Sequence, residues 1–171
     1  MDKNVYTLGL SKIEMGDIGA DGGMGQSLDV VGETLQGTCN ITQEDPVTND
    51  FYAEELDDPI VSISRRGKTT AAFSIANPNL DTLVKFFGGK ITGTGATAKW
   101  SAPKQLPDTE MSLRITPQMG LIWEFPRMKI NAKIDGSFSR EKIFVIAVSG
   151  TALQPSKTTE EIYSAYPIVS A

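Results

Sequence analysis

Residues 121–148 read LIWEFPRMKINAKIDGSFSREKIFVIAV, and this stretch decides the fold class. Apolar and polar residues alternate along 121–134, which is the two-residue period of a β-strand. Proline cannot donate to a strand ladder, so Pro126 predicts an edge or a bulge, in either one bent strand or a pair of strands. Asp135–Gly136 is typical of a tight turn. The apolar run Ile143–Val148 predicts a strand buried on both faces, and the whole stretch predicts antiparallel β-structure.

The same two-residue period runs through most of the chain. It predicts strands over 6–10, 13–15, 35–41, 59–64, 69–75, 96–101 and 111–115, with 59–64 and 69–75 joined as one hairpin. A change of phase between the first two strands predicts a bulge or bend there. We find no internal repeat and no linker, so the chain is predicted to be a single domain over 1–171.

One helix is predicted, over about residues 78–88. Asn77 is suited to cap its first turn and Pro78 to begin it, while Gly88–Gly89 can end it in a left-handed conformation. Leu80, Leu83, Val84 and Phe87 fall at helical spacing and predict one apolar face. The fold class is therefore mainly β, an antiparallel sandwich or barrel with one flanking helix.

Three segments break the strand pattern. Residues 16–27 are rich in glycine and predict a flexible loop. Residues from 154 onwards are polar and predict an extended C-terminal arm over 154–171. Residues 44–58 predict a long acidic loop with apolar anchors, and loops of this length are usually functional or ordered by a partner. The residues of this loop that we single out are Glu44, Asp45, Asp50, Phe51, Tyr52, Glu54, Glu55, Leu56, Asp57 and Asp58.

Composition excludes several classes of function. The chain has 171 residues, 40% of them hydrophobic and 22% charged, which is typical of a folded domain. Its net charge of -5 opposes general binding to nucleic-acid phosphates. With no histidine and only Cys39, histidine-dependent triads, most zinc sites and an intramolecular disulfide are excluded. Neither a basic start with an apolar run nor a membrane-spanning stretch is found, so we expect a soluble protein made in the cytoplasm.

No set of residues indicates catalysis, and we expect neither a cofactor nor a metal ion. The carboxylates are numerous enough for a glycosidase pair, but acidic runs are usually solvated surface. Trp100 and Trp123 are suited either to stack on sugars or to pack in the core. Arg65, Arg66 and Lys68 are either a solvated hairpin tip or charge partners for the acidic loop of another copy.

The stretch GTCNITQEDPVTNDFYAEELDDPIVSISRRGK (37–68), followed by NPNLDTLVKFFGG (77–89), resembles the major tail tube proteins of long-tailed bacteriophages. These share a fold with the tube protein of type VI secretion systems. The resemblance implies a two-sheet β-sandwich that assembles into hexameric rings, stacked as a hollow tube that conducts DNA. It implies a non-enzymatic virion protein whose partners are its own copies and the tape-measure, baseplate or tail-tip, and terminator proteins, with no membrane.

The resemblance also implies a docking role for the loop 44–58, with Phe51, Tyr52 and Leu56 as buried anchors and the acids setting the register between copies. Arg65, Arg66 and Lys68 are the candidate counter-charges, on charge complementarity alone. An acidic tube lumen is implied too, and Lys129 and Lys133 on one face of a central strand depart from it. The alternatives are a tube subunit of a contractile injection system, a monomeric carbohydrate-binding sandwich and a carboxylate-dependent hydrolase.

Overall fold

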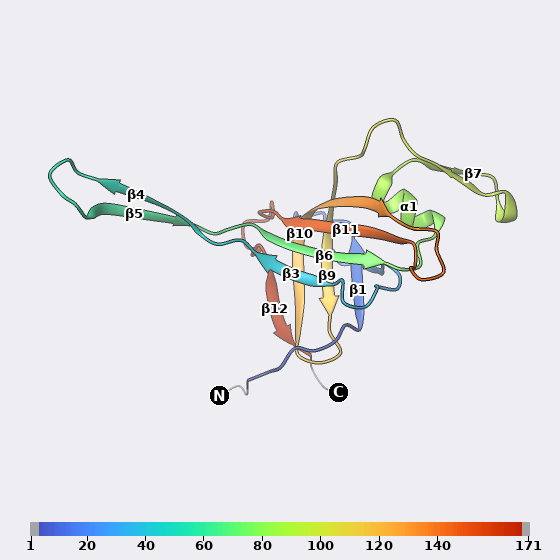
Figure 1. The fold of residues 1–171 in the computed structure, drawn as a ribbon, viewed down its shortest axis with the longest axis horizontal. Helices are drawn as coiled ribbons and strands as arrows, with labels where there is room; N and C mark the ends of the chain where they lie inside the picture. The colour runs from blue at the N-terminus through green and yellow to red at the C-terminus, as the bar shows by residue number, and fades with distance from the viewer. Residues whose placement is uncertain (1–3, 169–171) are drawn as a thin grey trace.

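The computed structural model describes residues 4–168 and is mainly β, with antiparallel strands and one flanking α-helix (Figure 1). This confirms the predicted fold class. The strands are β1 Lys12–Gly16, β2 Asp29–Val30, β3 Asn40–Gln43, β4 Val47–Tyr52, β5 Pro59–Arg65, β6 Thr69–Ile75, β7 Lys90–Thr92, β8 Lys99–Ser101, β9 Thr109–Thr116, β10 Leu121–Asp135, β11 Val145–Ala152 and β12 Ser164–Pro167. The helix is α1 Leu80–Phe87, and a short 3₁₀ turn covers Gly95–Thr97.

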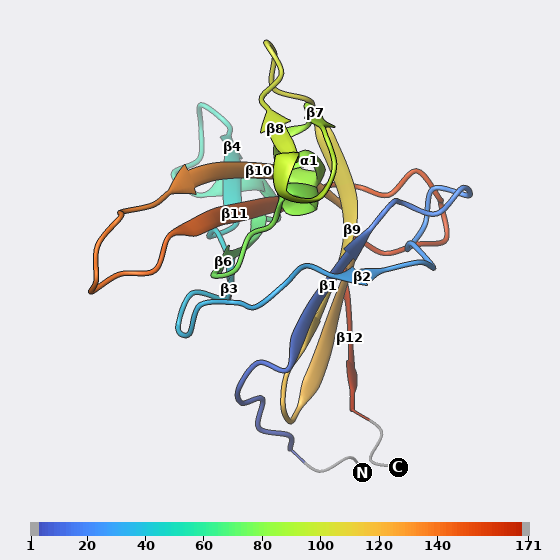
Figure 2. The same cartoon turned by 90° about the vertical axis from the view of Figure 1, so that its right-hand side faces the viewer.

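Eight strands form one continuous sheet in the order β2-β1-β9-β10-β11-β6-β3, and β12 also pairs with β10. The two ends of this order, β2 and β3, are not paired with each other. Figure 2 shows the half with β1, β9 and β12 turned away from the half with β11 and β6. The fold is therefore a strongly bent sheet, an open barrel whose two halves cover one core.

The bend lies in β10, at the position that Pro126 predicts. The register of β10 against β9 shifts between Phe125 and Met128. Both of these residues are fully buried, although a regular strand would point residues three apart to opposite faces. The bulge therefore changes the phase of the strand, and both halves of β10 send apolar side chains into the same core.

A buried hydroxyl holds this bend. The Oγ of Ser112, a residue with no exposed surface, donates to the carbonyl of Pro126 at 2.7 Å. The same Oγ accepts the backbone N–H of Gly25 at 2.8 Å. One side chain thus satisfies a backbone group of the bulge and a backbone group of the glycine-rich loop, both of which would otherwise be buried without partners.

Helix α1 starts two residues later than predicted. Its N-cap is Asn79, whose side chain accepts the N–H of Thr82, and its last turn ends at Gly88 with φ of 70°. Asn77, the predicted cap, instead accepts the N–H of Glu33 at 2.7 Å. Phe86 and Phe87 are buried and join the core. No helix in the part of the chain that the structure describes is long and apolar enough to cross a membrane.

Two predictions about the middle of the chain are wrong. Residues 59–64 and 69–75 are strands but do not pair as a hairpin, because β5 pairs with β4, whereas β6 pairs with β11 and β3. The segment 44–58 is not a structureless loop, since it contains β4 and the turn that joins it to β5. The density of acids in this segment concealed an alternation of apolar residues that continues into 59–65.

The ends of the chain differ from prediction as well. Residues 6–10 make only one bridge, Leu8 to Met119, and within 35–41 the strand begins at Asn40. Part of the predicted C-terminal arm, 164–167, is strand β12 on the chain's own sheet. The last three residues of that predicted arm lie outside the described residues.

Ser112→Ala tests the origin of the bend. Removing the hydroxyl leaves the Pro126 carbonyl and the Gly25 N–H buried without a partner, so we expect a loss of about 1–3 kcal/mol in the free energy of unfolding. Ser149→Ala, on the outer face of β11, is the matched control and should change stability by less than about 0.5 kcal/mol. Urea unfolding measures both, and equal effects would contradict this role of Ser112.

Candidate assembly interface

The predicted docking loop is one half of a hairpin, residues 44–68, that we call the arm. It projects away from the rest of the molecule (Figure 1). β4 and β5 pair only with each other, so each has one free edge. The arm extends the β3–β6 ladder, because Gln43 pairs with Thr69 and the Glu44 N–H donates to the Lys68 carbonyl at 2.9 Å.

The two faces of the arm differ in chemistry. The register pairs Val47 with Arg65, Asn49 with Ile63 and Phe51 with Val61, which places these side chains on one face, apolar toward the tip and ending in Arg65 at the base. We call Val47, Phe51, Val61 and Ile63 the apolar face; they are between 48% and 58% exposed. The opposite face is polar along 48–50 and 62–64, with Thr48 and Ser64 hydrogen bonded and Ser62 donating to Asp50. Beyond the register shift that follows Phe51, the predicted docking residue Tyr52 and its neighbour in the ladder Ile60 are also more than half exposed. Such an alternation normally has one face buried, and the described part of the chain covers neither face of the arm.

Charge divides the arm along its length. The tip between β4 and β5 carries Glu54, Glu55, Asp57 and Asp58 around Leu56, and we call it the acidic tip. The base carries Arg65, Arg66 and Lys68, which we call the basic base, beside Glu44 and Asp45. Seven residues of strand separate Asp58 from Arg65, roughly 24 Å at 3.4 Å per residue. The tip and base of one chain are therefore too far apart to pair.

The predicted site residues thus fall into three groups. Glu54, Glu55, Leu56, Asp57 and Asp58 lie at the tip, as a docking element requires. Phe51 lies on the apolar face, whereas Asp50 lies on the polar face and is already hydrogen bonded. The basic cluster lies at the base of the arm and not at a hairpin tip, which corrects one of its two predicted placements. Among residues 4–168, the ion pairs of the structure include no member of the acidic tip or the basic base.

Sequence reasoning missed three residues of the apolar face, Val47, Val61 and Ile63. Their signal was the two-residue spacing of Val47, Asn49 and Phe51, repeated by Val61 and Ile63. A strand reading of 47–52 was available from this pattern. The acids of 44–58 obscure this pattern, because charged residues are depleted in strands, a tendency that does not apply to a turn at a solvated tip.

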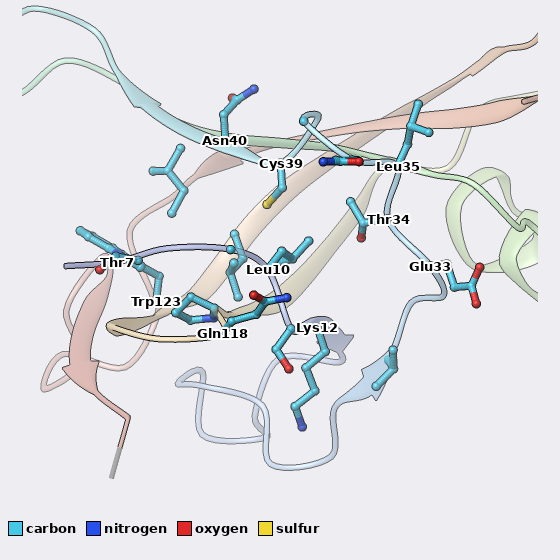
Figure 3. Close-up of a pocket in the computed structure, with 18 of the residues that line it drawn as sticks. Thr7, Leu10, Lys12, Glu33, Thr34, Leu35, Cys39, Asn40, Gln118 and Trp123 are labelled. Atoms are coloured by element: carbon cyan, nitrogen blue, oxygen red, sulfur yellow. The ribbon is translucent and has the colours of Figure 1, made fainter. Parts of the chain in front are cut away.

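A groove lies at the open seam of the barrel, between the unpaired terminal strands β2 and β3 (Figure 3). Its volume is about 1230 Å³. Residues 7–12, the connection 32–37 and the turn between β9 and β10 form its walls. We call it the seam groove, and its apolar lining includes Leu10, Leu35, Cys39, Ile41 and Trp123.

The seam groove borders the base of the arm. Trp123 lies 6.1 Å from Tyr163 between ring centroids, and the guanidinium carbon of Arg66 lies 5.5 Å from the centroid of the Tyr163 ring. A cation over an aromatic face is attracted by the ring quadrupole. One chain of contacts therefore joins the basic base to the lining of the groove.

Two carboxylates converge on the outer face of the sheet, and one of them, Glu14, accepts at 3.0 Å from Lys12, a residue that also lines the seam groove. Arg114 Nε donates to Glu124 at 2.6 Å, and its NH1 lies 3.9 Å from Glu14. The two carboxylate side chains are only 11% and 16% exposed. Tyr166 Oη donates to Glu124 at 2.8 Å, and burial together with that carboxylate raises the pKa of Tyr166. The Arg114 guanidinium bridges the two carboxylates, and both carboxylates are largely buried. This arrangement ties strands β1, β9 and β10 together.

The tryptophans differ in their surroundings. Trp100 Nε1 donates to the Gly88 carbonyl at 2.9 Å, and its ring packs against Phe87. It therefore braces the end of α1 against β8, while Trp123 faces the seam groove (Figure 3). Within the described residues, no group of three or more cysteine, aspartate or glutamate side chains is arranged to hold a metal ion.

No known family model matches this sequence. No curated protein matches it either. The geometry of the arm and the seam groove is therefore what indicates a function for this chain.

Hydrogen exchange compares two strands of seven residues each. In dilute protein we expect the amides of β5 to exchange much faster than those of β6, because an isolated two-stranded hairpin is marginally stable in water. At concentrations where the protein assembles, β5 should gain protection and β6 should change little. Equal protection of the two strands in dilute protein would contradict a free arm.

Proposed function

We propose that this chain is a structural, non-enzymatic subunit that assembles head to tail into hexameric rings, stacked as the hollow tail tube of a long-tailed bacteriophage. The observation that carries the proposal is the arm, an amphipathic hairpin whose apolar face, free edges and acidic tip have no partner among residues 4–168. A second copy of this chain can cover the apolar face, pair with the free strand edges and offer basic residues to the acidic tip. Free strand edges are commonly completed by a neighbouring chain through β-augmentation.

The polarity of the arm supports a head-to-tail arrangement. An acidic tip and a basic base on one chain are complementary between copies, since the tip of one arm can approach the base of the next. Interfaces that join different surfaces of identical chains generate rings or filaments. The tube proposed from the sequence needs this kind of contact within and between rings.

Passage of DNA requires a wall that does not hold phosphates. The net charge of -5 favours such a wall because it repels the DNA backbone. Lys129, which departs from this charge pattern, lies 3.2 Å from Asp108 and is partly neutralised by it. Its neighbour Lys133 on the same face is exposed. We propose that DNA moves through the lumen without specific contacts, in a virion completed by tape-measure, baseplate or tail-tip, and terminator proteins.

Negative-stain electron microscopy of the purified protein at high concentration, with light scattering for its mass, tests the proposal directly. We expect discrete rings or hollow tubes. A protein that stays monomeric at every concentration and binds glycans saturably, with binding lost in Trp123→Ala, would instead be the carbohydrate-binding sandwich. A companion tail sheath around the tubes would favour a contractile injection machine.

Charge reversal at the base of the arm tests the head-to-tail contact. In Arg65→Glu/Arg66→Glu we expect the concentration needed for assembly to rise about tenfold or more, which corresponds to about 1.4 kcal/mol or more of interface free energy. Light scattering measures this concentration. The monomer should stay folded by circular dichroism, since Arg65 and Arg66 lie outside the core cluster.

Charge reversal at the acidic tip is the complementary test of the same contact. Asp57→Lys/Asp58→Lys alone should also weaken assembly, and combining it with Arg65→Glu/Arg66→Glu should restore part of the loss. Lys90→Glu/Lys99→Glu, on the exposed strands β7 and β8, is the matched control. Normal assembly of both single-end variants would remove this charge contact from the interface.

A further inference from the structure

The seam groove is a consequence of incomplete closure. Strands β2 and β3 end the sheet on either side of it, and only the connection between them crosses the gap. The residues at its floor, such as Leu10, Cys39 and Trp123, pack against the buried core. The groove therefore gives access to the core between the two terminal strands, β2 and β3.

The dimensions of the groove favour a protein segment over a small molecule. Its volume of about 1230 Å³ exceeds the range of roughly 300–1,000 Å³ that is usual for small-ligand pockets. Its lining combines apolar side chains such as Leu10, Leu35 and Ile41 with polar ones, and the groove lies between β2 and β3, each of which has one free edge. A strand or hairpin with one apolar face has the matching shape and chemistry.

We propose that the seam groove receives the apolar face of the arm of a second copy of this chain. This inference rests on the proposed function and assigns the acceptor surface that the assembly needs. The chain's own arm cannot reach the groove, because the arm extends the β3–β6 ladder straight outwards from the body (Figure 1). A second copy is therefore the chain whose arm can bring this exposed apolar face to the groove.

Charge complementarity orients the incoming arm. The basic base adjoins the groove through Arg66, Tyr163 and Trp123. An arm that lies in the groove with its acidic tip toward the Trp123 end brings four carboxylates to this cluster, whereas the reverse orientation carries them away from it. Electrostatic pairing at the rim thus selects one of the two directions in which an amphipathic hairpin can lie.

The single native cysteine makes the proposal testable without a label. Cys39 lies in the groove, so a cysteine placed on the apolar face of the arm can form a disulfide with Cys39 of a neighbour. A disulfide requires its two Cα atoms to lie within about 7 Å of each other, so a link forms only where the introduced cysteine directly contacts Cys39 of the neighbour. The variants are Val47→Cys, Val61→Cys and Ile63→Cys, made separately. Burial raises the pKa of the Cys39 thiol, so assembled protein is oxidised with diamide at mildly alkaline pH.

Three matched controls share the arm but face the other way. Thr48→Cys, Ser62→Cys and Ser64→Cys place the thiol on the polar face, next to the test positions in the chain. Phe138→Cys, in the exposed β10–β11 connection, tests a rival occupant of the groove. Each test variant is also made with Cys39→Ser, which removes the acceptor thiol. Non-reducing gels and peptide mass spectrometry identify the links.

We expect at least one apolar-face variant to give a ladder of covalent oligomers through Cys39, with no ladder from the polar-face variants or with Cys39→Ser. Tubes that form without such links, or that link through Phe138→Cys instead, would overturn the groove assignment and leave the tube intact. Covalent dimers alone, without tubes, would support the groove as acceptor and contradict the head-to-tail tube. A strict monomer in both experiments would contradict both proposals.

Discussion

The architecture depends on a hydrogen bond inside the bend of β10, from the Ser112 hydroxyl to the Pro126 carbonyl. Without a bulge at this point, a strand that buries Phe125 would expose Met128, and the sheet could not cover a core with both halves of β10. The bulge solves this problem but leaves backbone groups without ladder partners. Ser112 satisfies one of them and, through Gly25, anchors the glycine-rich loop over the same site.

The bend also determines where the sheet stops. A strongly bent sheet either closes into a barrel or leaves two terminal strands facing a gap. Here the terminal strands are short, two residues in β2 and four in β3, and they remain unpaired with each other. Apolar side chains such as Leu10 and Trp123 line the gap where it opens onto the core. Incomplete closure therefore produces the seam groove, while the same edge strand β3 continues into the arm.

Local patterns predicted the parts of the fold that local chemistry determines. Pro126 predicted the bulge, Gly88 the end of the helix, and alternation the strands of the core. Strand pairing was harder, because two strands adjacent in the chain usually form a hairpin, and β5 pairs instead with a segment concealed by its acids. The prediction of Asn77 as the helix cap was wrong for a similar reason. Asn77 and Asn79 are equally suited to capping, and only the contact of Asn77 with Glu33 distinguishes them.

The candidate site was predicted only in part, since the tip acids and Phe51 are visible in sequence but the groove is not. Its lining comes from the N-terminal segment, the 32–37 connection and the β9–β10 turn, which the topology alone brings together. The proposed contact between the arm of one copy and the groove of the next has a consequence for closure. In a linear array joined by that contact, one arm and one groove stay unused, whereas a closed ring uses every one. Heterologous contacts of this kind close into a ring where the rotation between neighbours permits it and otherwise continue as a filament.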